Sequence, residues 1–231
     1  MKRIIFGLIL VISFSQCATE TKNTIISGTV QGLKKGQLLI QELNDTVLVT
    51  LDSIAVQGNA DFKFSVDVEE PEVLYLALIF QDSVTPTKYI PFFAERGAVN
   101  IQTDLENFEL DYAVSGSQNQ TVWNEYRQLM RRYNEKKLDY IKEELSAMQS
   151  GNTSETENWR TQQQKLMTSR YLATVNFAKN HRDMAIAPYL MLLEIPDVNV
   201  KYHDTIYKLL SPEIKNSKYG NALESFILEQ N

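Results

Sequence analysis

The sequence is poor in the residues that build redox, metal and catalytic sites, with one cysteine and two histidines among 231 residues. A single cysteine excludes an intramolecular disulfide, a CxxC pair and a cysteine-based zinc site, and two histidines offer few ligands for another metal. The sequence also lacks GxSxG, HExxH, GxGxxG and Walker-type motifs. We therefore expect no catalytic residue set, no metal and no cofactor.

The apolar run at the start of the chain is too short for a membrane-spanning helix. Residues 4–14 would reach about 16 Å as a helix, roughly half of a ~30 Å hydrocarbon core. Lys2 and Arg3 precede this run, and small and polar residues follow it, which is typical of a secretory signal. We interpret residues 1–16 as a signal peptide that directs export.

Cys17 follows this run directly, where bacterial lipoproteins carry the cysteine that becomes acylated. The stretch resembles a lipobox, although residues 13–16 read SFSQ instead of Leu followed by small residues. The alternative is a plain signal peptide with an incidental cysteine. We expect Cys17 to be lipidated and residues 17–23 to form a linker. This predicts a membrane-anchored lipoprotein of a Gram-negative cell envelope, in the outer membrane.

Residues 24–116 have the pattern of an antiparallel β-sandwich. Short apolar stretches are separated by turn signals, and about eight strands recur at 8 to 12 residue spacing. Phe62, Phe64, Val66 and Val68 alternate strictly with polar residues, which places them on one face of a strand.

Residues 117–231 predict a helical region. Apolar positions fall at steps of three and four from Val122 to Met148, and a second such stretch follows the SGNTS break at residues 150–154. These two stretches predict a long antiparallel helix pair, with shorter helices after it. The expected fold class is therefore α+β, a β-sandwich followed by a helical region.

The charge distribution bears on the expected partners. The formal net charge is −6, and residues 17–115 hold 15 acidic and 6 basic side chains. Such a charge disfavours nucleic acid and anionic lipid headgroups. We expect contact with the membrane only through the N-terminal lipid, together with an envelope protein partner.

Aromatic and basic side chains gather along the predicted helix pair. Such a strip suits a sugar or peptide ligand, but a tyrosine stripe at helical spacing also suits the seam between the helices and the sandwich. The candidate ligand or partner surface consists of Trp123, Tyr126, Arg127, Tyr133, Tyr140 and Trp159.

Two further groups have structural interpretations. Glu69, Glu70 and Glu72 lack the spacing of a calcium loop, which favours a solvated inter-strand loop. His181 lies at the predicted end of the second long helix, where capping is favoured, and His203 has no nucleophile or acid beside it.

The order of motifs resembles a known family arrangement. After the lipobox come ISGTVQGLKKGQLLIQEL, LDSIAVQGNADFKFSVDVEEPEVLYLAL, FFAERGAVNIQ, VSGSQNQTVWNEY and LSPEIKNSKYGNALESFI. This order resembles the β-rich domain of unknown function that precedes a thioredoxin-like module in Gram-negative envelope lipoproteins related to thiol-disulfide interchange proteins.

The resemblance implies an accessory domain without redox chemistry of its own. In those relatives the CxxC pair belongs to the C-terminal module, and this sequence ends at Asn231, about where that module would begin. We expect a non-catalytic binding or scaffolding role. The alternatives are an accessory subunit or degenerate relative of an envelope thiol-disulfide oxidoreductase system, and a hydrolase whose site has no sequence motif.

Overall fold

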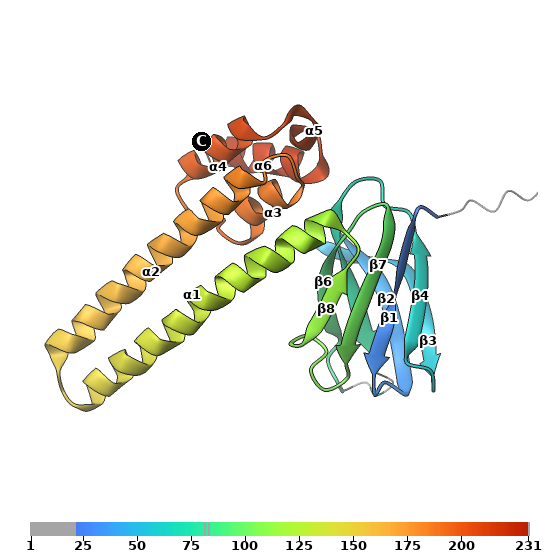
Figure 1. Cartoon of the computed structure of the whole chain (residues 1–231), viewed down its shortest axis with the longest axis horizontal. Coiled ribbons are helices and arrows are strands. Elements are labelled where there is room, and N and C mark those ends of the chain that lie inside the picture. Colours follow the sequence, from blue (N-terminus) through green and yellow to red (C-terminus); the bar gives the residue numbers. More distant parts are fainter. Residues whose placement is uncertain (1–21, 81, 83, 231) are drawn as a thin grey trace, which may run out of the picture.

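The computed structural model describes residues 22–80, 82 and 84–230, and places a β-sandwich before a helical region (Figure 1). The predicted signal peptide and Cys17 lie outside the described residues. The α+β fold class is confirmed. The elements are β1 (Thr24–Gln31), β2 (Lys35–Asn44), β3 (Val47–Gln57), β4 (Asp61–Val66), β5 (Glu72–Ile79), β6 (Lys88–Ala94), β7 (Gly97–Asp104), β8 (Tyr112–Ser115), α1 (Gln118–Gln149), α2 (Thr153–Asn180), α3 (Ile186–Leu193), α4 (Val200–Leu209), α5 (Pro212–Lys215) and α6 (Lys218–Glu229).

The sandwich consists of two four-stranded sheets. Their strand orders are β4-β1-β7-β8 and β3-β2-β5-β6. The strand pairs are antiparallel except β1 and β7, which run parallel from Thr24 opposite Gly97 to Gln31 opposite Asp104. The expectation of a purely antiparallel sandwich is therefore wrong at this one pair. Five strands, β2 to β6, lie between β1 and β7 in the chain, so no tight turn forces them to be antiparallel.

A continuous apolar core fills the space between the sheets. In β4, Phe62, Phe64 and Val66 are buried while Asp61, Lys63 and Ser65 are exposed, as the alternation predicts. On the opposite sheet, the buried side chains of β2 and β5 face them. Removal of these side chains from water is the main term that stabilises the sandwich.

The long helices α1 and α2 form an antiparallel hairpin that projects from the sandwich (Figure 1). Ser117 caps α1 by accepting a hydrogen bond from the N–H of Gln120, and Asn152 caps α2 by accepting from Glu155. The shorter helices α3 to α6 pack around the base of the hairpin (Figure 1). None of the helices within the described residues is both long and apolar enough to cross a membrane.

An aromatic cluster joins the helical region to the outer face of β5 and β6. The ring of Phe93 lies 5.4 Å from Trp123, 5.2 Å from Tyr189 and 6.2 Å from Tyr219, in edge-to-face geometry. The backbone N–H of Phe93 donates to Oε1 of Gln120 at 2.7 Å. Both polar and apolar contacts therefore hold α1, α3 and α6 against the sheet.

A polar contact fastens α6 to the same sheet. The Lys218 ammonium contacts the carboxylates of Glu42 and Glu72. The backbone N–H of Lys218 donates to the Glu70 carboxylate at 2.9 Å. Glu72 is only 8% exposed. The interpretation of the glutamate cluster as a solvated loop is therefore wrong for Glu70 and Glu72, because α6 packs on them. Within the described residues, no group of three or more His, Cys, Asp or Glu side chains could hold a metal ion.

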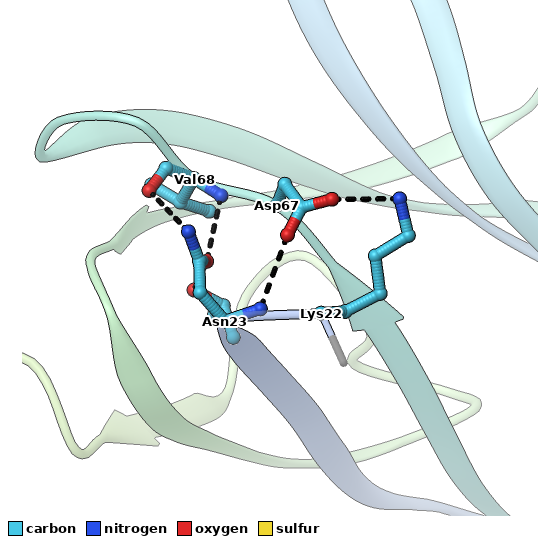
Figure 2. Close-up of polar contacts among 5 residues, drawn as sticks. Lys22, Asn23, Asp67 and Val68 are labelled. Carbon is cyan, nitrogen blue, oxygen red and sulfur yellow. Dashed lines mark hydrogen bonds and ion pairs between the residues drawn. The ribbon is translucent and has the colours of Figure 1, made fainter. Parts of the chain in front are cut away.

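The start of β1 is tied to the residues that follow β4 (Figure 2). The side chain of Asn23 donates to Val68 O at 3.0 Å and accepts from Val68 N at 2.9 Å. Lys22 pairs with Asp67 at 2.7 Å and, with the N–H of Asn23, holds the pKa of that carboxyl below its usual value. The chain therefore enters the sandwich at a fixed point.

Asn23→Ala is expected to lower the free energy of unfolding by about 1–2 kcal/mol, because both backbone groups of Val68 lose a partly buried partner. The measurement is urea unfolding followed by circular dichroism. Asn100→Ala is the matched control, since its amide donates to Ser27 O at 3.4 Å and accepts from the Gln102 amide at 3.0 Å, and loss of these exposed contacts should cost less than about 0.5 kcal/mol. Equal losses in the two variants would contradict the prediction.

Candidate functional site

Two adjoining hollows lie along one side of the hairpin, and together we call them the hairpin cleft. The distal hollow has a volume of about 320 Å³ and the proximal one about 310 Å³. Asn134 and Arg170 line both hollows, so the cleft is elongated. The remaining lining residues are Tyr133, Lys137, Arg160, Gln163, Gln164, Leu166 and Met167 distally, and Tyr126, Arg127, Met130, Arg131 and Glu194 proximally.

The cleft exists because the seam between α1 and α2 becomes polar beyond the base of the hairpin. Tyr126 and Met130 are buried near the base, whereas Lys137, two α1 turns further on, is exposed. On α2, Arg160, Gln163 and Arg170 take up the facing positions. Long polar side chains extend their charged ends to water and do not fill a helix interface as apolar ones do. The helices therefore leave an open channel between them.

The lining carries an excess of positive charge. It includes five cationic side chains and one carboxylate, that of Glu194. Arg160 donates to Glu144 at 2.8 Å and, with Gln163, holds the pKa of this carboxyl below its usual value. Arg131 and Lys137, by contrast, are exposed and form no ion pair with a described residue. The cleft can therefore attract an anion, although the whole chain has a net charge of −6.

Arg170 lies where the two hollows meet. Its Nη2 donates to Glu194 at 3.2 Å, while its Nε is buried and finds no acceptor among the described residues. Next to it, the hydroxyls of Tyr126 and Thr174 lie 3.0 Å apart, and burial raises the pKa of Tyr126 well above its usual value. Tyr126 is therefore a neutral phenol, and Arg170 carries a buried N–H that no described residue accepts.

The comparison with protein families identifies the N-terminal region. Residues 24–123 match the family described as a domain of unknown function (DUF4369). This part of the chain is similar to that family, and we call it the DUF4369 domain below. No curated protein and no solved structure matches the chain. The resemblance read from the sequence is thus confirmed for the β-rich region, and the lining residues of the hairpin cleft lie beyond the matched range.

The structure separates the aromatic residues that the sequence grouped as one candidate surface. Trp123 is 6% exposed and packs against Phe93 of the sandwich, and Tyr126 is 1% exposed with its ring 5.3 Å from Phe177. Trp123 therefore lies in the seam between helix and sandwich, the alternative for the stripe, whereas Tyr126 packs against α2. Tyr140 and Trp159 pair with ring centres 5.4 Å apart, nearer the tip of the hairpin.

Three of the predicted residues line the cleft, the buried Tyr126 and two others. Tyr133 lies in the distal hollow, where its hydroxyl is 3.3 Å from the Ser169 hydroxyl. Arg127 lines the proximal hollow, and its guanidinium lies 4.4 Å from the ring centre of Tyr112 in β8. The cleft thus has one end against the DUF4369 domain.

The sequence reasoning missed most of the cleft, namely Lys137, Arg160, Gln163, Arg170 and Glu194. For the cleft residues on α1 and α2, the sequence did contain a pattern that indicates such an opening. Polar side chains at the three-and-four spacing of an otherwise apolar seam mark a place where two helices cannot close. Glu194 lies just after α3 and had no such signal.

The two histidines have structural contacts. His181 ends α2, and its Nδ1 lies 2.9 Å from Phe177 O, so the predicted capping position is confirmed. His203 is fully buried, with Nε2 3.1 Å from Met191 O, and burial lowers the pKa of its ring.

Proposed function

We propose that this protein is a lipid-anchored cell-envelope protein with a non-catalytic binding role, which it performs through the hairpin cleft. The observation that carries the binding role is the elongated cleft with five cationic side chains and one carboxylate. It is open enough for a ligand, and three of its cations, Arg127, Arg131 and Lys137, have no ion-pair partner among the described residues. Because the cleft lies outside the DUF4369 domain, that domain supports the helices and does not itself bind the ligand.

The place where the chain enters the fold supports the anchored arrangement. Asn23 is fixed at the start of β1, at the end of the sandwich where α1 also begins but on the side away from the tip of the hairpin (Figure 1). A lipid on Cys17 would hold the sandwich near the membrane through a short linker. The hairpin would then extend from the sandwich towards a partner.

The anchor is tested by the incorporation of labelled palmitate in a Gram-negative host. We expect label in the wild-type protein and in Ser15→Ala, and none in Cys17→Ser, which should also leave the membrane fraction. Acylation needs the thiol at this position, whereas a small residue two positions before it is compatible with a lipobox. Absence of label from the wild-type protein, together with its recovery in the soluble fraction, would refute the anchor.

A second candidate function is that of an accessory subunit of an envelope thiol-disulfide oxidoreductase. The observation that favours it is the DUF4369 match, because the resemblance places such domains before thioredoxin-like modules. Crosslinking in intact cells should then recover a CxxC protein with the wild-type chain. Failure to recover one after crosslinking would exclude this candidate.

A further inference from the structure

We propose that the hairpin cleft binds an acidic amphipathic helix of a partner protein. This inference rests on the proposed binding function and specifies the chemistry of the partner. It combines three observations: the unbalanced charge of the cleft, the lack of an exposed aromatic platform in it, and a stripe on α1 that changes from cationic to apolar.

The charge selects an anionic partner. Arg131 and Lys137 are exposed, and Arg170 keeps a buried Nε–H without an acceptor among the described residues. Glu194 holds one end of the Arg170 guanidinium, so this side chain is already oriented before a ligand arrives. A partner carboxylate that binds here gains charge-assisted hydrogen bonds from side chains that are partly fixed.

The other lining groups favour a polypeptide over an acidic sugar. Sugar sites commonly present an aromatic face, but the ring of Tyr126 is covered by Phe177 and Tyr133 is half-buried. The lining instead offers the amides of Asn134 and Gln164 beside the exposed thioether of Met167. Amides match the polar groups of a peptide, and methionine adapts to varied apolar side chains.

The stripe on α1 indicates that this polypeptide is helical. Its members follow one another at steps of three and four and therefore lie on one face of the helix. They are Arg127, Arg131, Asn134, Leu138, Ile141, Leu145 and Met148.

The distal half of this stripe exposes apolar surface. Leu138, Leu145 and Met148 are 66%, 53% and 52% exposed, which is unusual for three apolar residues on one face. A third helix laid along α1 and α2 would cover them with its own apolar residues and place its carboxylates against the cations nearer the base. This is the helix-in-groove mode of recognition, with charge deciding which partner fits.

The test measures binding of fluorescein-labelled synthetic helices to the full-length protein in mild detergent by fluorescence anisotropy. The first peptide is three LEELEEL heptads, and the second has lysine in place of each glutamate. Oligogalacturonate of similar charge serves as the acidic glycan. We expect the glutamate peptide alone to bind, with an affinity that falls as salt is raised.

The variant Arg131→Glu with Lys137→Glu should weaken binding of the glutamate peptide at least about tenfold, a change of about 1.4 kcal/mol. It should also gain affinity for the lysine peptide, which a merely structural effect would not produce. The matched control is Arg132→Glu with Lys165→Glu, which makes the same charge change at exposed positions outside the cleft lining. The affinity of this control variant for the glutamate peptide should stay within about twofold of the wild-type value. Should the first variant not fold, Arg131→Gln and Lys137→Gln are measured singly.

The outcomes separate this proposal from the proposed function. Binding of oligogalacturonate in place of the glutamate peptide overturns the helical partner but leaves a binding protein. Equal weakening by the cleft variant and its control shows that net charge alone attracts the peptide, and overturns the site. Absence of binding by all three probes also overturns this proposal, while the palmitate experiment decides the anchor independently.

Discussion

Phe93→Ala is expected to lower the free energy of unfolding by about 3–5 kcal/mol, because it removes a fully buried ring from the junction between the DUF4369 domain and the helices. The rings of Trp123, Tyr189 and Tyr219 all lose an edge-to-face partner. The hydrogen bond from the backbone N–H of residue 93 to Gln120 remains, but the cavity left by the ring stays empty. The helical region should therefore be held less tightly than the sandwich.

The neighbouring residue supplies a matched control for this prediction. Phe92 is also fully buried, but its ring points into the core between the sheets. Both tryptophans of the chain lie in the helical region, so their fluorescence reports on that region while circular dichroism reports on the whole chain. In urea we expect the fluorescence transition to precede the circular dichroism transition in Phe93→Ala only. Coincident transitions in both variants would show that the junction does not depend on Phe93.

The fold could be predicted from the sequence wherever the pattern was local. The alternation of Phe62, Phe64 and Val66 predicted the buried face of β4. The spacing of apolar residues also gave the hairpin of α1 and α2. Each of these features depends on neighbours within a few turns or strands.

Contacts between distant segments could not be predicted in this way. The parallel pairing of β1 with β7 and the contact of Lys218 with Glu42 join residues far apart in sequence, and no local pattern encodes either. The candidate site could not be predicted in full for a related reason. Tyr126 and Tyr133 follow the same spacing, yet the first is buried by α2 while the second lies where the seam opens. Only the packing of both helices distinguishes them.

The second large effect is expected at the start of the hairpin, where Gly116→Ala should lower the free energy of unfolding by about 3 kcal/mol. Gly116 has φ +109° and lies between β8 and Ser117, the N-cap of α1. A Cβ at this position would lie 1.9 Å from the carbonyl oxygen of Ala98, a backbone atom that cannot move without distorting β7. Alanine therefore suffers both an unfavourable φ and a steric clash.

Gly97→Ala separates these two causes. Gly97 has φ +130°, but a Cβ there meets no atom within 4 Å, so only the conformational cost of about 1–2 kcal/mol is expected. Urea unfolding of the two variants gives the cost of the clash as their difference. A loss no larger in Gly116→Ala than in Gly97→Ala would show that the strand yields easily. A larger loss means that the close approach of residue 116 to β7 fixes the direction in which α1, and with it the hairpin cleft, leaves the DUF4369 domain.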